Sequence, residues 1–160
     1  MNAATSAITA LPQIRMTVWN FYKLDSLLAV RADEWSWKAD ALLARELKRT
    51  IVMDDNRIPS NVATMRSRVE FRIEGTGLIQ IATLVYPGEG HMFEDAISVL
   101  TPLGSAILGL SEGQSISYAS PNGTPVKVTI LRILHQPEAD RQRSARRSAE
   151  EFSALQFERL

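Results

Sequence analysis

The sequence contains no cysteine and only two histidines among its 160 residues. The absence of cysteine excludes disulfide bonds and thiolate chemistry and is compatible with a reducing compartment, so we expect a cytoplasmic protein. His91 and His135 lie far apart in the sequence, and no histidine pair has the spacing of metal ligands. The sequence therefore predicts no metal site and no cofactor.

Long apolar runs and an excess of one charge are also lacking. No apolar stretch approaches the roughly 20 residues that a membrane span needs, so we expect no membrane partner. Lys and Arg number 18, as do Asp and Glu, so the net charge is zero and no overall field favours nucleic acid. Residues 1–13 lack the basic start and the apolar core of a signal peptide, so we expect a flexible N-terminal tail.

Motifs of self-contained active sites are missing too. The pairs Gly75/Gly77 and Gly88/Gly90 are too short for a phosphate-binding fingerprint. No Gly-x-Ser-x-Gly nucleophile elbow is present. The sequence thus predicts a protein that is not an enzyme.

Residues 14–58 have the pattern of two short helices. Apolar residues at helical spacing run from Phe21 to Val30, with Asn20 as the predicted N-cap, and a second stripe runs to about Ile51. The link between the stripes is short, which favours an antiparallel helical hairpin. The charged residues of the second helix are expected to face water; they are Arg45, Glu46, Lys48 and Arg49.

The tip of this hairpin carries the adjacent acids Asp33 and Glu34. They either form a solvated turn with a favourable charge at a helix N-terminus, or they reach a partner's metal or basic pocket. Trp35 and Trp37 either cover the apolar seam of the hairpin, or one of them is an exposed anchor of the kind enriched at interfaces. Trp19 is expected in the core.

Residues 59–138 alternate in the manner of strands and contain one helix. Turn residues separate the segments, so we expect antiparallel hairpins with one helix packed on the sheet, an α+β arrangement. Thr101 is placed to cap the helix, with Pro102 at its first position and Gly109 ending it. The predicted strands span 67–73, 78–86, 96–100, 115–118 and 126–134, and the predicted helix spans 102–108.

Residues 139–160 form a charged tail in which four arginines precede two glutamates and a few apolar residues. Ser148 and Glu151 have capping-box spacing, which favours a terminal helix. A segment this charged must find a docking surface to offset its ordering entropy, so disorder is the alternative. The tail either makes a weak contact with nucleic acid, stabilises a dimer or has no binding role. The arginines are Arg141, Arg143, Arg146 and Arg147.

Residues 64–136 resemble the C-terminal domain of the bacterial Gre factors (GreA/GreB), a compact FKBP-like module. The matching segments are Ile97–Gly104, Ala106–Gly109, Glu112–Gln114 and Pro121–Gly123. Over residues 16–139 the chain is also similar to Rnk-type regulators of nucleoside diphosphate kinase, in which a short helical hairpin precedes the module. The segments that carry this similarity are Ala41–Leu42, Glu46–Leu47, Val62–Val69, Thr83–Pro87 and Gln136–Ala139.

The resemblance implies a fold and a partner. The implied fold is a short N-terminal antiparallel helical hairpin followed by an FKBP-like antiparallel sheet with one packed helix. The implied partner is bacterial RNA polymerase, with the module docked at the rim of the secondary channel and the hairpin pointing inward. Ser98, Thr101 and Pro102 are the docking residues that the matching strand and turn imply.

The length of the hairpin separates two functions within this resemblance. In Gre factors a long hairpin carries acidic residues to the active-site magnesium and promotes cleavage of backtracked RNA. A second helix of about 15 residues rises only roughly 22 Å, about half of such an arm. The resemblance therefore implies a non-catalytic regulator that competes with Gre factors, provided that the helix stops before Asp54. The alternatives are a cleavage-stimulating factor and a direct regulator of nucleoside diphosphate kinase, while prolyl isomerase activity has fold analogy alone behind it.

Overall fold

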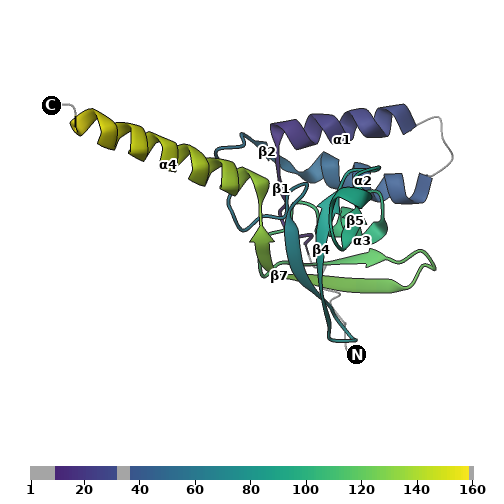
Figure 1. Ribbon diagram of the computed structural model, residues 1–160. Helices are drawn as coiled ribbons and strands as arrows, with labels where there is room; N and C mark the ends of the chain where they lie inside the picture. The colour runs from purple at the N-terminus through teal and green to yellow at the C-terminus, as the bar shows by residue number, and fades with distance from the viewer. Residues whose placement is uncertain (1–9, 32–36, 159–160) are drawn as a thin grey trace.

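The computed structural model describes residues 10–31 and 37–158 and has the α+β architecture expected from the sequence (Figure 1). The described residues form both helical elements and strands. In order they are β1 (Arg15–Thr17), α1 (Val18–Arg31), α2 (Trp37–Arg49), β2 (Ile51–Met53), β3 (Arg68–Ile73), β4 (Leu78–Val85), the 3-10 turn η1 (Gly90–Met92), β5 (Ala96–Ser98), α3 (Pro102–Ile107), β6 (Ser115–Ala119), β7 (Pro125–His135) and α4 (Pro137–Phe157).

Five strands form the main sheet, in the order β5-β4-β3-β7-β6. The pairs β3–β4, β3–β7 and β6–β7 are antiparallel, as the turn residues predicted. The expectation of a wholly antiparallel sheet is wrong at one place, because β5 pairs in parallel with β4. The ten residues between these strands carry the chain back along the sheet through η1, so that β5 starts beside Thr83 and runs in the same direction as β4.

A second, two-stranded parallel sheet joins the two ends of the helical hairpin and was not predicted. β1 and β2 pair with Arg15 opposite Ile51. The Ile51 N–H donates to the Ile14 carbonyl at 2.9 Å, and the Arg15 N–H donates to the Gly109 carbonyl at 3.0 Å. The base of the hairpin is therefore bonded to the segment that follows α3.

The helices begin and end slightly away from their predicted limits. α1 starts at Val18 because the Thr17 side chain, rather than that of Asn20, accepts a hydrogen bond from the first turn, with the Asn20 N–H as donor at 3.2 Å. α2 stops at Arg49, ahead of Asp54, because residues 51–53 enter β2. Trp19 lies at the surface with 69% of its area exposed, so its prediction as a core residue is wrong.

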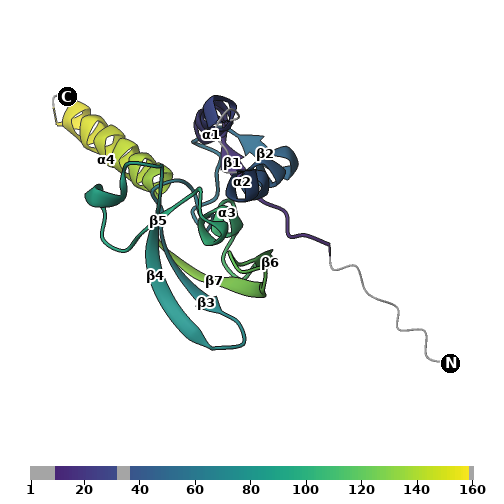
Figure 2. The same cartoon turned by 90° about the vertical axis from the view of Figure 1, so that its right-hand side faces the viewer.

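One hydrophobic core joins the hairpin to the sheet. Phe71 and Leu84 from the sheet, Ile107 from α3, Leu24 from α1 and Leu43 from α2 are all fully buried in the same cluster. α2 packs directly on α3, and Figure 2 shows the hairpin lying against that helix. Because these side chains are shielded from water only when the hairpin packs on the sheet and α3, the hairpin and the sheet stabilise one another.

The C-terminal segment is helical, so the helix alternative for the tail is confirmed. α4 begins at Pro137, directly after β7, and Ser148 lies in its interior; the predicted start at Ser148 is wrong. The first turn is docked, because the buried Glu138 carboxylate accepts a hydrogen bond from the Thr64 hydroxyl at 2.6 Å. Beyond its second turn α4 projects away from the rest of the molecule (Figures 1 and 2).

Candidate functional site

The three predicted docking residues lie in a single turn between β5 and α3. The Ser98 hydroxyl accepts a hydrogen bond from the Leu100 N–H at 3.2 Å, and its carbonyl accepts one from the Thr101 hydroxyl at 2.7 Å. The Thr101 oxygen also caps α3 by accepting from the Gly104 N–H at 3.1 Å, with Pro102 at the first helical position. The predicted cap is thus confirmed, while a docking role for these residues stays a prediction.

The turn is both accessible and tightly held. Thr101 is exposed, and Ser98 and Pro102 are half-buried. Gly104 lies directly beneath them, and a Cβ on this residue would come within 2.8 Å of the Ser98 carbonyl carbon and closer still to its oxygen. The Ser105 hydroxyl donates to the Val99 carbonyl at 2.6 Å. Such a turn can present the same surface to a partner without reordering, which lowers the entropic cost of binding.

A second group of polar residues surrounds Tyr86, at the end of β4. Because β4 and β5 are parallel, Tyr86 and the turn at Ser98 follow neighbouring strand ends, with Val85 paired to Ser98. The Tyr86 hydroxyl donates to the Asn20 side-chain oxygen at 2.9 Å. The Lys23 ammonium lies 4.0 Å from the centroid of the Tyr86 ring, a cation–π distance. These contacts join α1 to the sheet.

Arg66 and Glu89 form an ion pair beside the same ring. The Arg66 Nε donates to Glu89 at 3.1 Å, and this hydrogen bond holds the pKa of the Glu89 carboxyl below its usual range and raises the pKa of Arg66. Burial raises the pKa of the Tyr86 phenol, which therefore stays protonated. The group around Tyr86 thus has fixed charges and a protonated phenol, as expected for a structural joint rather than for acid–base chemistry.

Replacement of Tyr86 by phenylalanine should lower the free energy of unfolding by about 1 kcal/mol at neutral pH, since the hydrogen bond to Asn20 is lost. The raised pKa of Tyr86 adds a pH dependence. The phenol's contribution is complete below the unfolded value of about 10 and declines as pH rises toward the higher folded value. Urea denaturation at pH 7 and pH 10.5 should therefore show a smaller alkaline loss in the variant than in the wild type.

The matched control for this prediction is Tyr22→Phe, because Tyr22 is 64% exposed on the same helix as Asn20. It should leave the unfolding curves at both pH values unchanged. Equal stability of Tyr86→Phe and the wild type at pH 7 would show that the contact to Asn20 adds nothing.

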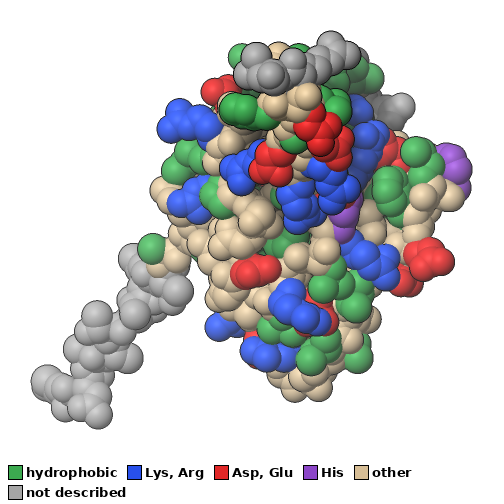
Figure 3. Space-filling model, turned by 60° about the vertical axis from the view of Figure 1, so that its left-hand side comes forward, with side chains coloured by type: hydrophobic (Ala, Val, Ile, Leu, Met, Phe, Trp, Pro, Cys, Tyr) green, Lys and Arg blue, Asp and Glu red, His purple; other side chains and the backbone are tan. Residues whose placement is uncertain are grey.

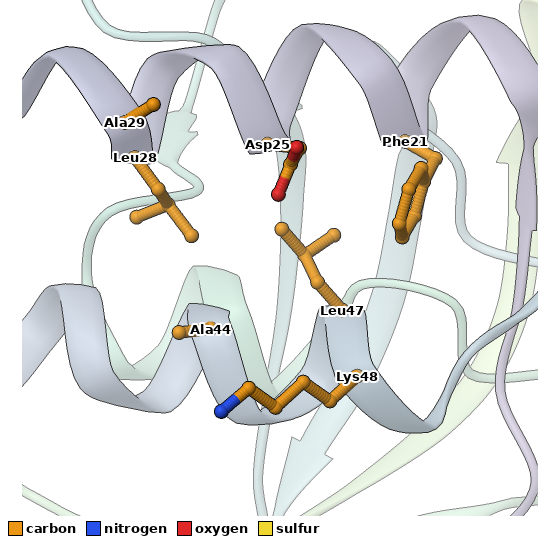
Figure 4. Close-up of a pocket in the computed structure, with 7 residues that line it drawn as sticks. All are labelled: Phe21, Asp25, Leu28, Ala29, Ala44, Leu47 and Lys48. Atoms are coloured by element: carbon orange, nitrogen blue, oxygen red, sulfur yellow. The ribbon is translucent and has the colours of Figure 1, made fainter.

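The two helices of the hairpin leave an apolar groove of about 330 Å³ between them (Figure 4). α1 contributes Phe21, Leu28 and Ala29, with the Asp25 carboxylate between them, and α2 contributes Leu47 and its neighbours. The Lys48 ammonium stands at the rim. This lining has room for an apolar side chain of a partner, and it holds no pair of groups placed for catalysis.

The predicted tip residues Asp33, Glu34 and Trp35 lie outside the described residues. The helices on either side of them are joined by an ion pair, in which the Arg31 Nε donates to Asp40 at 3.2 Å. α1 has 14 residues and α2 has 13, so each rises about 20 Å. The hairpin is thus as short as the sequence predicted, and its second helix does end before Asp54.

The described part of the chain was compared with the requirements of a metal site and of a membrane-spanning helix, and it meets neither. Across residues 10–31 and 37–158, no three His, Cys, Asp or Glu side chains gather as metal ligands. His91 lies in η1, while the His135 Nε2 is 2.6 Å from the Asp140 carboxylate at the base of α4. None of the helices in these ranges is long and apolar enough to cross a bilayer.

Comparison with known proteins identifies the family of this architecture. The family model "Transcription elongation factor, GreA/GreB, C-term" matches residues 58–135, which include the whole main sheet and α3. The "Regulator of nucleoside diphosphate kinase" of Escherichia coli K12 is 41% identical over 101 residues, covering 63% of this chain and 74% of that relative. The chain belongs to the GreA/GreB family, in its Rnk-type branch. This membership supports a transcription-factor-like regulator.

Other relatives in this family carry the names of elongation factors. GreA of Chloroflexus aurantiacus is 33% identical over an alignment of 103 positions, and the match covers 60% of this chain and 65% of that protein. The solved structure titled "Prokaryotic transcription elongation factor GreA/GreB from Nitrosomonas europaea" has 33% identity and a TM-score of 0.61, and the match covers 77% of this chain and all of that one. The family model ends at residue 135, so α4 lies beyond it.

The group around Tyr86 is the part of the site that sequence reasoning missed. The matching segment Thr83–Pro87 drew attention to Tyr86, but no local pattern connects it to Asn20 and Lys23, which lie more than 60 positions earlier. Arg66 has a φ of +63°, a conformation that non-glycine residues rarely adopt and that no sequence signal marks here.

Proposed function

We propose that this protein is a non-catalytic regulator that binds bacterial RNA polymerase at its secondary channel and competes there with Gre factors. The observation that carries the proposal is membership of the GreA/GreB family, with the matched module presenting the rigid turn of Ser98, Thr101 and Pro102 at its surface. In this proposal the turn contacts the rim of the channel, and the hairpin enters it.

The geometry of the hairpin supports regulation over cleavage. α2 spans about 20 Å and ends at Arg49, where β2 pairs with β1. The hairpin is also packed on α3 through the shared core, which shortens its reach beyond the module. An arm of this length does not bring Asp33 and Glu34 to a catalytic metal deep in the channel, so the protein occupies the channel entrance without promoting RNA hydrolysis.

The second candidate function, direct regulation of nucleoside diphosphate kinase, rests on the name of the Escherichia coli relative. The two candidate functions predict different binding partners. A direct regulator would bind the purified kinase and change its rate in the absence of polymerase.

The test is a competition experiment with bacterial core RNA polymerase. We expect saturable binding of this protein that a Gre factor displaces, together with inhibition of Gre-dependent RNA cleavage and no cleavage stimulated by this protein alone. Absence of binding at about 50 μM, a concentration well above the dissociation constants of specific regulators, would exclude RNA polymerase as the partner. Cleavage that disappears in Asp33→Ala would instead identify a cleavage factor.

The docking turn can be tested without unfolding it. Thr101→Ser keeps the capping oxygen and removes only a methyl group, and Pro102→Ala removes the half-buried ring at a helical position that tolerates alanine. The double variant should weaken polymerase binding by about tenfold, which corresponds to about 1.4 kcal/mol, and keep the melting temperature of the wild type. Leu78→Ala, which removes an exposed side chain at the start of β4, outside both the turn and the hairpin, is the comparison. Equal affinity of the double variant and the wild type would exclude the turn as the docking surface.

A further inference from the structure

One edge of the main sheet is covered over only part of its length. β4 runs from Leu78 to Val85, but β5 pairs only with its last three residues, Thr83 to Val85. Among the described residues no strand pairs with residues 78–82 on that side, and Figure 2 shows the lower part of β4 at the outer edge of the sheet. We call residues 78–82 the free edge. A strand edge of this kind presents backbone N–H and C=O groups to a further strand.

The hydrogen bonds of β4 show which residues of the free edge point outward. The Leu84 N–H donates to the carbonyl just before β3 at 3.1 Å. The Thr83 N–H donates in the opposite direction, to the carbonyl just before β5, at 3.0 Å. Because this direction alternates along a strand, even-numbered residues of β4 bond to β3 and odd-numbered residues point away from it. The backbone N–H and C=O groups of Ile79 and Ile81 therefore face outward at the free edge.

The side chains of the free edge offer no protection against pairing. Residues 77–85 contain no charged residue and no proline, which are the usual devices that keep sheet edges apart. Leu78 is 52% exposed, Ile79 is 56% exposed and Ile81 is 37% exposed. Figure 3 shows hydrophobic side chains at the lower end of the molecule, which the ribbon of β3 and β4 forms in Figure 1. The free edge is thus open to a further strand in both its backbone and its side chains.

We propose that the free edge pairs antiparallel with the free edge of a second copy of this chain, with the twofold axis at Gln80. In this register Ile79 exchanges both of its outward backbone hydrogen bonds with the partner subunit's Ile81, and symmetry repeats the exchange on the other side of the axis. The main sheets of the two copies then form one continuous sheet.

The side chains of the free edge fit this register. Ile79 lies beside the partner subunit's Ile81, and neighbouring β-branched side chains stabilise a pair of strands. Gln80 meets its own copy across the axis, where the two side-chain amides can hydrogen-bond to each other. Leu78 lies opposite the partner subunit's Ala82, so a large side chain meets a small one.

Charge complementarity favours a second copy as the occupant and sets its direction. β3 places Arg72 beside Ile79 and Glu70 beside Ile81. In the twofold register each row across the joined sheet therefore has an arginine on one side and a glutamate on the other, about 14 Å apart. Both charges are already paired within their own copy, so the match acts on the choice of partner and direction more than on affinity. A parallel pair would place like charges in the same row.

The contact is short, so the association is expected to be weak. Two strands of five residues bury less surface than the roughly 1,200 Å² at the lower limit of stable complexes, and we expect a dissociation constant of about 100 μM. Sedimentation equilibrium between about 5 and about 500 μM covers this value. The proposal does not rest on polymerase binding and the experiment contains no polymerase, so the two proposals can fail separately.

Two double variants test the pairing through charge. Ile79→Lys/Ile81→Lys should dimerise at least about tenfold more weakly than the wild type, because lysines of the two copies then lie side by side. Ile79→Lys/Ile81→Glu should dimerise more strongly than the double-lysine variant, because the twofold register places each lysine beside a glutamate of the other copy. Both positions are exposed, so the melting temperature serves as the control for folding.

The matched control is Phe152→Lys/Leu155→Lys, which adds the same two charges to exposed positions of α4, away from the sheet. It should dimerise like the wild type. A wild type that stays monomeric at about 500 μM would overturn the proposal and leave the free edge to an extended segment of another protein. A double-lysine variant that dimerises like the wild type, or a lysine–glutamate variant no better than the double-lysine one, would overturn it as well.

The register can be read from single cysteines, because the chain has no cysteine of its own. Gln80→Cys lies on the proposed axis in a pair without backbone hydrogen bonds, where the two Cα atoms are about 4.5 Å apart, so it should form a disulfide-linked dimer under mild oxidation. Leu78→Cys should not, since its two copies are about 14 Å apart in this register. Cross-linking through Leu78→Cys instead of Gln80→Cys, or equally through both, would contradict the antiparallel register.

Discussion

Replacement of Gly104 by alanine is expected to lower the free energy of unfolding by about 3 kcal/mol. The added Cβ would lie 3.0 Å from the Thr101 hydroxyl oxygen and closer to the Ser98 carbonyl group. Backbone cannot rotate away as a flexible side chain can, so either β5 or the first turn of α3 must move. Thermal unfolding followed by circular dichroism should show a melting temperature about 10 °C lower.

Gly90→Ala is the control for this prediction. No atom lies within 4 Å of a Cβ at Gly90, and its φ is not in the left-handed region, so the same chemical change should have almost no effect. If Gly104→Ala melted within about 2 °C of the wild type, the close approach of α3 to the carboxyl end of β5 would be wrong. The same variant should also bind RNA polymerase more weakly, because it displaces the proposed docking turn.

Replacement of Glu46 by alanine is expected to cost about 3 kcal/mol, because it leaves a partly buried arginine without its partner. Glu46 is fully buried and accepts hydrogen bonds from Arg45 at 2.8 Å and from the Arg49 Nε at 2.6 Å. Arg49 also donates to the Pro12 carbonyl, so the pair connects α2 to the segment that leads into β1. Urea denaturation should show a lower midpoint with an unchanged slope.

A double-mutant cycle separates the ion pair from general damage to α2. Glu46→Ala/Arg49→Ala should be less destabilised than the sum of the two single variants, since neither charge is then left alone. Lys48→Ala, an exposed change on the same helix, should stay within about 0.5 kcal/mol of the wild type. Additive effects in the cycle would show that the two side chains do not stabilise one another.

The turn before α3 and the buried Glu46 show where prediction from the sequence succeeds and where it fails. The turn at Thr101 and Pro102 was predicted with its cap and its first helical residue, because capping depends on residues three positions apart. Glu46 was expected to face water, and it is fully buried instead. Its environment includes Arg49 and the segment at Pro12, 34 positions earlier in the sequence. A local sequence pattern cannot show a contact between residues so far apart.

A lack of local signal also explains why strands β1 and β2 were not predicted. β1 and β2 have three residues each, too few for an alternating pattern, and Ile51 also continued the apolar stripe of α2. The parallel pairing of β5 with β4 depends on the path of the connection through η1, which turn residues alone do not specify. The spacing of the apolar residues predicted the hairpin and the strands, the resemblance implied the same arrangement, and the structure adds the contacts that join them around Tyr86.

The position of β1 has a consequence for the order in which the chain folds during synthesis. Its Arg15 N–H donates a hydrogen bond to the Gly109 carbonyl. The two segments can approach this closely because Gly109 has no Cβ; a Cβ there would lie 2.9 Å from the Arg15 carbonyl oxygen. The hydrogen bonds within the two helices of the hairpin are local, so these helices can begin to form as soon as they leave the ribosome. Their base is completed only after the 60 residues between Arg49 and Gly109 have also emerged, so the nascent hairpin is expected to expose Leu24 and Leu43 to chaperones until α3 arrives.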